Sequence, residues 1–178
     1  EAATGRGVFI TLKAAAGDLG MDLANSSAVV QGFGQVGSAL AELLHAAGTR
    51  IVAVSDVFGG ITNADGIDIA GLKAHLSETG KVVGFPGTEP IGNEDLFAID
   101  CDIIVPAAVQ SVIHQGNAAD VKATLIVEGA NGPVTNAADD ILAQKKVTIV
   151  PDVVANSGGA TVCHFERTQG LSYQYWDL

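Results

Sequence analysis

Residues 32–37 have the types and the spacing of a phosphate-binding loop. Gly32, Gly34 and Gly37 fit the pattern G-x-G-x-x-G, and they follow a short apolar run at 28–30. Gly32 allows a tight turn from strand to helix, Gly34 lets a diphosphate approach the backbone, and Gly37 lets the helix pack closely on a sheet. The helix start would offer unpaired N–H groups and partial positive charge to phosphates.

An acidic residue stands where a dinucleotide site needs a partner for a ribose. A helical pattern runs from Val36 to Ala47, and a second apolar run at 51–54 ends in Asp56. This carboxylate lies roughly twenty residues beyond the glycines, the usual separation for a group that accepts hydrogen bonds from ribose hydroxyls. A lone glycine motif is a weak signal, and the alternative is a purely structural turn. The ordered succession of strand, glycines, helix, strand and acid favours a nucleotide site.

The composition limits the class of protein. The chain has 178 residues, 48% of them hydrophobic, which favours one domain with a sizeable core. Its net charge of −11 argues against a nucleic-acid partner, because phosphate contacts need a basic patch. No apolar run reaches the roughly 18 residues of a membrane span, and no secretion signal opens the chain. We therefore expect a cytoplasmic protein without nucleic acid or membrane as partner.

The cysteines and histidines indicate neither a disulfide nor a metal site. Cys101 and Cys163 are far apart and form no C-x-x-C pair, which is typical of a reducing compartment. The histidines are scattered without metal-ligand spacing, so we expect no bound metal. Cys163 precedes His164, but consecutive helical residues do not face each other, so a nucleophilic pair is not favoured.

Apolar runs alternate with helical patterns along the whole chain. Buried strands are expected at 28–30, 51–54, 101–105, 125–127 and 147–150, and helices at 5–20, 36–47, 67–77, 136–144 and 160–168. Thr4 is expected to cap the first helix and Thr135 the fourth. The segments 58–66 and 81–93 are rich in glycine, proline and other turn residues and are expected to be irregular. This alternation predicts an α/β fold of the Rossmann type, a doubly wound, mostly parallel sheet in a three-layer αβα arrangement.

In such a sheet, ligands bind at the carboxyl ends of the strands, near the point where the strand order reverses. Small or polar residues follow each predicted strand at this edge: 32–37, Asp56, Ala107 and Ala108, 129–131 and 156–159. Loops at strand ends are polar in any case, so no single cluster is decisive. Five clusters on one edge of one sheet favour an extended ligand site.

Together these motifs resemble the nucleotide-binding domain of the glutamate dehydrogenase family over nearly the whole chain. The matching segments are Ala3–Val8, Gln31–Gly37, Ser55–Asp56, Pro106–Ala108, Glu128–Pro133 and Ala155–Gly159, followed by Phe165, Glu166 and Gln169. The resemblance implies that residues 1–178 form the C-terminal NAD(P)-binding Rossmann domain of such an enzyme. It implies oxidative deamination of glutamate to 2-oxoglutarate and ammonia, with hydride passing to a nicotinamide, in a homo-oligomer that is commonly a hexamer.

The resemblance also assigns roles to individual positions. It places the cofactor at Thr4, Gly32, Phe33, Gly34, Gln35, Val36, Gly37, Asp56, Ala107, Ala108 and Asn131, and the substrate at Asn156, Ala160 and Cys163. Thr4 and Asn131 would meet the nicotinamide end, and Asp56 the adenosine ribose. In this family the catalytic Lys and Asp lie on the preceding domain, so no catalytic residue is expected here. The chain alone is expected to bind dinucleotide weakly and to turn over nothing.

Two departures from the family keep alternatives open. Glutamate enzymes usually carry Ser at the position of Cys163, and a thiol is the weaker donor to a distal carboxylate. Val often stands at the position of Ala160, so the pocket is wider here. A leucine, phenylalanine or valine dehydrogenase of the same family therefore stays open. A non-catalytic nucleotide-sensing Rossmann module is a further alternative, although Asn131 and the cluster at 156–159 argue against it.

The cofactor is predicted to be NAD. Asp56 would repel a 2′-phosphate, and no Arg or Lys lies within 57–66. NADP stays possible, because the family includes NADP users with an acid near this position.

Overall fold

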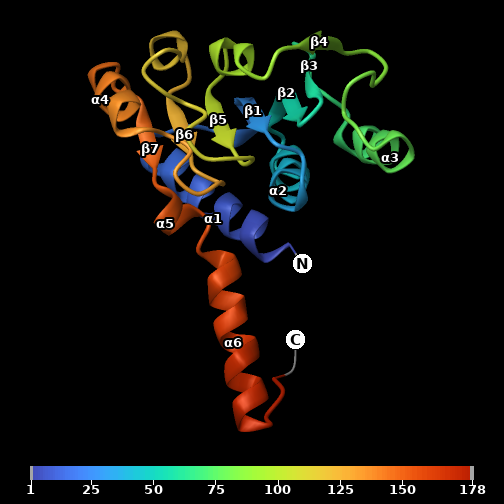
Figure 1. Cartoon of the computed structure of the whole chain (residues 1–178), viewed down its shortest axis with the longest axis vertical. Coiled ribbons are helices and arrows are strands. Elements are labelled where there is room, and N and C mark those ends of the chain that lie inside the picture. The colour runs from blue at the N-terminus through green and yellow to red at the C-terminus, as the bar shows by residue number, and fades with distance from the viewer. Residues whose placement is uncertain (1, 177–178) are drawn as a thin grey trace.

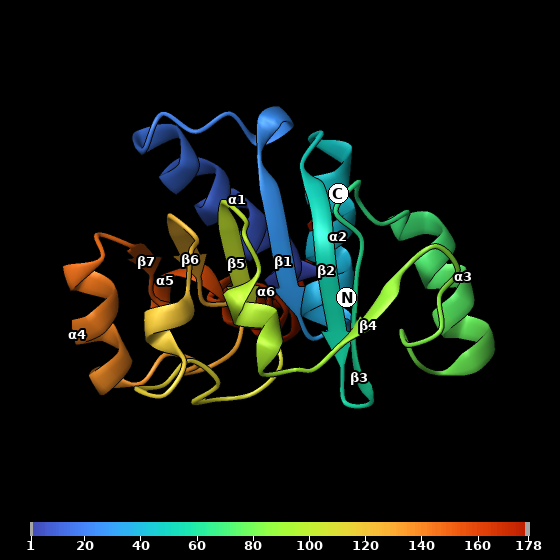
Figure 2. The same cartoon turned by 90° about the horizontal axis from the view of Figure 1, so that it is seen from above.

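The computed structural model describes residues 2–176, and a seven-stranded sheet runs through its centre (Figures 1 and 2). The strand order is β4-β3-β2-β1-β5-β6-β7. Five strands are parallel: β1 (Ser27–Gln31), β2 (Arg50–Asp56), β5 (Ile103–Pro106), β6 (Leu125–Val127) and β7 (Thr148–Val150). The antiparallel strands β3 (Gly59–Thr62) and β4 (Glu89–Ile91) complete one edge. The mostly parallel α/β sheet is confirmed.

Helices cover both faces of the sheet (Figure 1). The α-helices are α1 (Ala3–Asp18), α2 (Gln35–Ala46), α3 (Ile69–Thr79), α4 (Asn136–Gln144), α5 (Asp152–Ala155) and α6 (Gly158–Ser172). Three short 3₁₀ turns are η1 (Leu23–Asn25), η2 (Asp95–Ala98) and η3 (Ala118–Asp120). The helix α6 projects away from the sheet and buries none of its residues (Figure 1).

The strands bury side chains on both faces, because alternate residues point to opposite sides. On one face Ile103 and Leu125 join a cluster with Leu12 of α1 and Leu40 of α2. On the other face Ile104 and Ile126 pack with residues of η2, η3 and α4. Burial on both sides explains why β5 and β6 read as continuous apolar runs.

The prediction of an irregular loop at 58–66 is wrong in part, because this segment contains β3. Gly60 pairs with Ser55 of β2, and Ile61 with Val54. A Cβ added at Gly60 would lie 2.8 Å from Cγ2 of Ile91, the residue opposite it in β4. The glycine therefore allows β3 and β4 to lie close together. The segment 81–93 likewise contains β4, which pairs with β3. Neither strand shows apolar alternation, so only the backbone pairing of β3 with β2 and of β4 with β3 reveals them.

The cap predicted at Thr4 is also wrong. The first helix begins at Ala3, and Ala2 occupies the N-cap position without a side-chain hydrogen bond. By contrast, Thr135 caps α4 as predicted, accepting from the N–H of Ala138. The predicted bounds 125–127 and 136–144 match the structure, and the remaining boundaries differ by up to four residues; the first helix ends at Asp18, for example, and the last spans 158–172.

The two cysteines lie in opposite environments. Cys101 is 6% exposed, and burial, followed by the charges of Asp102 and Asp100, raises its pKa to about 12. Cys163 is exposed on α6, and both thiols are free. A thiolate is the reactive form, so Cys101 should be inert at neutral pH.

We therefore predict that a thiol-reactive disulfide reagent modifies one cysteine of the native chain quickly and the second only after denaturation. The measurement is the burst of released chromophore, with Cys163→Ala as control. That variant should show no fast phase in the native state. Rapid reaction of both thiols in the native chain would contradict the burial of Cys101.

Candidate functional site

The glycine loop lies between the carboxyl end of β1 and the start of α2, and its own packing requires two of its glycines. Gly32 has φ +90°, a left-handed conformation that favours glycine, and an added Cβ would lie 2.9 Å from Cβ of Ala108. A Cβ at Gly37 would overlap with the carbonyl oxygen of Gly32. These contacts hold the start of α2 directly against the end of β1.

Gly34 differs from both neighbours. Its φ of −78° is open to any residue, and a Cβ added there would meet no atom within 4 Å. Nothing within the described residues therefore explains a glycine at this position. The open space beside its backbone is available to a ligand that needs close approach.

The start of α2 presents unpaired donors to that space. Gly32 donates its N–H to the carbonyl of Ser55, and Ser38 donates to the carbonyl of Gly34. Within residues 2–176, the backbone N–H groups of 33–37 have no hydrogen-bond acceptor. The helix α2 has 12 residues, so its macrodipole adds partial positive charge at the same end. An anion with several oxygens fits this arrangement.

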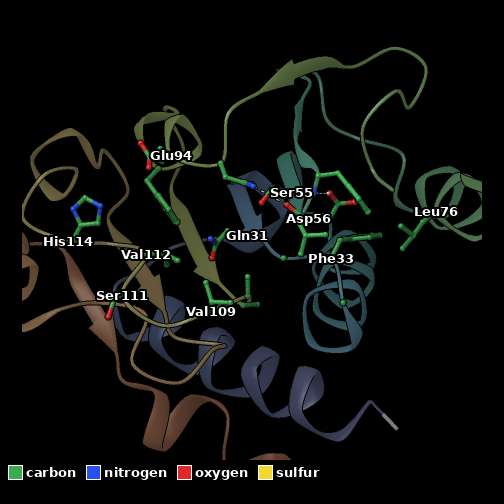
Figure 3. A pocket seen from close by; sticks show the side chains of 18 of the residues that line it. Gln31, Phe33, Ser55, Asp56, Leu76, Glu94, Val109, Ser111, Val112 and His114 are labelled. Carbon is green, nitrogen blue, oxygen red and sulfur yellow. Dashed lines mark hydrogen bonds between the residues drawn. The ribbon is translucent and has the colours of Figure 1, made fainter. Parts of the chain in front are cut away.

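A cavity of about 680 Å³ opens beside the loop, between the ends of β1 and β2 (Figure 3). The predicted residues that line it are Gly32, Phe33, Gly34, Asp56, Ala107 and Ala108. Its charged lining consists of two carboxylates, Asp56 and Glu94, without a Lys or Arg among the described residues. The cavity therefore suits a group that is apolar or carries hydroxyl donors rather than a second anion.

The carboxylate of Asp56 is fixed in the wall of this cavity. One oxygen accepts from the N–H of Phe58 and the other from the N–H of Val82, each at 2.7 Å. The backbone carbonyl of Asp56 accepts from the side-chain amide of Asn93 at 3.0 Å. An ionised carboxylate accepts about four hydrogen bonds, so capacity remains for hydroxyl donors.

A second cavity, of about 870 Å³, adjoins the first at the end of β5. The two share Ala107, Ala108 and Val109 in their linings. The further predicted residues that line the second cavity are Thr4, Val36, Asn131, Asn156 and Ala160. β1 lies between β2 and β5, so the joined cavities sit where the strand order reverses.

Hydrogen bonds between neighbouring loops shape the second cavity. The N–H groups of Gly129 and Ala130 both donate to the carbonyl of Pro106, at 3.0 and 2.9 Å. The amide of Asn156 donates to the side-chain oxygen of Asn131 at 2.7 Å. The loops after β5, β6 and α5 therefore meet in one polar corner.

Three predicted residues line neither cavity. Gln35 and Gly37 lie in the first turn of α2, with Gly37 behind the loop. Cys163 is exposed on α6, one turn beyond Ala160.

The structure also brings in residues that the sequence reasoning missed. Glu94, Ser111 and His114 line the first cavity (Figure 3), and Asn93 and Gln31 do so as well. Within the described residues, the side-chain oxygens of Gln31 and Asn93 are buried without a partner. Buried acceptors rarely stay unpaired, so a ligand or water fits beside them. The position of Gln31 directly before the glycines was an available signal; the others come from irregular segments.

Residues 2–176 contain neither a candidate metal site nor a candidate membrane-spanning helix. No three His, Cys, Asp or Glu side chains are grouped so that they could hold a metal ion. No described helix has the length and apolar character needed to cross a membrane.

Comparison with known proteins places these features in a family. The sequence model of the Glutamate/Leucine/Phenylalanine/Valine dehydrogenase family matches residues 1–178. The chain belongs to this family. A glutamate dehydrogenase of Thermotoga maritima is 48% identical over 179 aligned residues, which span 100% of this chain and 43% of that protein.

Solved dehydrogenases of this family share the fold. A hetero-hexameric glutamate dehydrogenase from Thermus thermophilus superposes with a TM-score of 0.91 at 31% identity, over 99% of this chain and 41% of that one. Glutamate dehydrogenase 2 of Plasmodium falciparum gives a TM-score of 0.87 at 28% identity, over 99% and 41%. The chain thus spans less than half the length of these relatives.

The contacts of the loop predict opposite effects of alanine at two glycines. Gly37→Ala should lower the free energy of unfolding by about 3 kcal/mol or more, because the new methyl group overlaps with backbone. Gly34→Ala should change it by less than about 0.5 kcal/mol, because its methyl group enters open space. Chemical denaturation measures both. Equal destabilisation by the two substitutions would contradict this account of the loop.

Proposed function

We propose that residues 1–178 are the C-terminal, NAD(P)-binding domain of a glutamate dehydrogenase. The full enzyme would oxidise L-glutamate to 2-oxoglutarate and ammonia. The observation that carries the proposal is the open glycine, Gly34, beside two joined cavities, with Asp56 in the first and Asn131 and Asn156 in the second. Similarity to proteins named glutamate dehydrogenase supports the substrate.

Each part of a dinucleotide then has a complement in this chain. The N–H groups at the start of α2 bind the diphosphate, with Phe33, Gly34, Gln35 and Val36 around it. Asp56 accepts hydrogen bonds from the adenosine ribose in the first cavity. Asn131 and Thr4 hold the nicotinamide end in the second, where Asn156 and Ala160 face the substrate. The bound nicotinamide would supply the hydride acceptor, and the protein supplies binding and orientation.

The second cavity also indicates what this chain does not provide. Its lining contains no Asp, Glu, His, Lys or Cys within the described residues. Oxidation of an amine needs a group that accepts a proton near the reacting carbon. We infer that this base comes from another part of the enzyme, so the isolated chain should bind cofactor without catalysing the reaction.

The alternatives differ in what the second cavity must hold. Gly159 and Ala160 leave its α6 side small and apolar, and Cys163 lies outside it, which would suit an apolar amino acid. Comparing kcat/KM for glutamate and leucine in the full-length enzyme separates these substrates. A sensing module would need only the first cavity, so the polar corner at Asn131 and Asn156 favours a dehydrogenase. A homo-oligomer, hexameric in the full-length protein, and a cytoplasmic location complete the proposal.

The cofactor prediction is tested by direct titration of this chain. NAD should bind roughly tenfold more tightly than NADP, because the 2′-phosphate would approach Asp56 without a cation nearby. Asp56→Asn should narrow that ratio by removing the charge. Isothermal titration calorimetry with both cofactors measures it, and tighter binding of NADP to the unsubstituted chain would overturn the preference.

The glycine loop provides a second test, on the diphosphate. Gly34→Ala should weaken NAD binding about tenfold or more while the thermal midpoint stays near that of the unsubstituted chain. Adenosine, which lacks phosphate, is the matched ligand and should lose little affinity. Unchanged NAD binding by Gly34→Ala would remove the main support for the proposed site.

A further inference from the structure

Two carboxylates stand behind the second cavity and connect the segments that carry its asparagines. We propose that Glu128 and Asp152 are positioning residues that set Asn131 and Asn156 for the nicotinamide end of the cofactor, an inference that rests on the proposed function. Neither residue lines the cavity, so neither would touch the ligand. They would act by fixing the backbone segments from which they accept hydrogen bonds.

Glu128 bridges two loops at the end of β6. It is 7% exposed, and its two carboxylate oxygens accept from different segments. One accepts from the N–H of Asp152 at 2.8 Å, and the other from the N–H of Val134 at 3.3 Å. The start of α5 and the end of the loop that carries Asn131 are thereby held by a single side chain.

Asp152 makes the reciprocal connection. One of its carboxylate oxygens accepts from the N–H of Gly132 at 2.8 Å, next to Asn131 in the chain. The other accepts from the N–H of Val153 at 2.6 Å, within the first turn of α5. The two acids therefore cross: Glu128 reaches the start of α5, and Asp152 reaches the loop after β6.

The crossed bonds lead directly to the asparagine pair. The carbonyl of Asp152 accepts from the backbone N–H of Asn156 at 2.9 Å, across the four residues of α5. The amide of Asn156 donates to the side-chain oxygen of Asn131 at 2.7 Å and lies 3.4 Å from the carbonyl of Ala130. A shift of α5 against the loop would separate these two side chains.

The surroundings of Glu128 act on the pKa of its carboxyl group in opposite directions. Burial raises its pKa; hydrogen bonds from the N–H groups of Asp152 and Val134 oppose this rise, and the charges of Asp152 and Asp139 add to it. Because the folded-state pKa is raised, folding weakens as the pH rises from the unfolded pKa through the folded one. The role proposed for Glu128 rests on the two N–H groups that its carboxylate holds, those of Val134 and Asp152.

The test compares two ligands on the chain. Glu128→Gln keeps the shape but replaces one acceptor oxygen with an amide NH2 group, which cannot accept from a backbone N–H. NAD, which would fill both cavities, should bind about tenfold more weakly, whereas ADP, which stops at the diphosphate, should change less than twofold. Asp139→Asn is the matched control, because it removes a nearby charge from an exposed side chain and leaves the crossed bonds intact.

Asp152→Asn provides an independent variant, since Asp152 is only half-buried, and it should repeat the selective loss of NAD. Nuclear magnetic resonance adds a direct readout: the side-chain amide signals of Asn131 and Asn156 should shift in both variants and not in Asp139→Asn. Equal loss of NAD and ADP, or no loss, in the folded variants would overturn the positioning role. Failure of the unsubstituted chain to bind either ligand would instead defeat the proposed function.

Discussion

The contact between the end of β1 and the start of α2 is the constraint on which the site depends. Gly37 lies so close to the carbonyl oxygen of Gly32 that no side chain fits between them. This contact directs the first turn of α2 at the edge where β1, β2 and β5 end. The N–H groups of residues 33–37 have no acceptor within residues 2–176, and the space beside Gly34 is open. The proposed phosphate site would therefore rest on backbone packing, without a cationic side chain among the residues that line the first cavity.

An anion site built without cationic side chains is compatible with a strongly acidic chain. The net charge is −11, yet the proposed diphosphate site needs only dipoles and N–H groups, whose attraction is local. Two acidic side chains, Asp56 and Glu128, accept hydrogen bonds from backbone N–H groups near the same edge of the sheet. Asp56 is fixed by the backbone of residues 58 and 82, and Glu128 by that of 134 and 152. In both cases backbone N–H groups, rather than a Lys or Arg, hold the carboxylate.

In the proposed function, the two cavities would bind different parts of the dinucleotide. The first contains carboxylates and unpaired acceptors, which suit the hydroxyl and amine donors of a nucleoside. The second is neutral and is built from small residues and two linked asparagines. Such a wall could orient the proposed nicotinamide ring, but it has no Asp, Glu, His, Lys or Cys in its described lining to exchange a proton with it. The chemistry would require an opposing wall, and the relatives, more than twice as long as this chain, have the length to supply one.

Local patterns in the sequence determined the parallel half of the fold. The strands at 28–30, 51–54 and 125–127 were recognisable because they are buried on both faces and follow turn signals. The glycine spacing and Asp56 were recognisable because both stand at a fixed distance from a predicted strand in the sequence. Most of the predicted ligand positions consequently do line the two cavities.

Tertiary structure alone decided the antiparallel edge and the outer parts of the site. Gly59–Thr62 is a strand because it pairs with the edge of β2, and Glu89–Ile91 is a strand because it pairs in turn with β3, although their residues favour turns. Thr4 does not cap the helix because the helix starts two residues earlier than predicted, and Thr4 lines the second cavity instead. Glu94 and His114 come from separate segments to line the first cavity. Glu128 and Asp152 likewise connect two loops that are separated in the sequence. Contacts between such segments depend on how the strands are ordered in space, and no local pattern encodes that order.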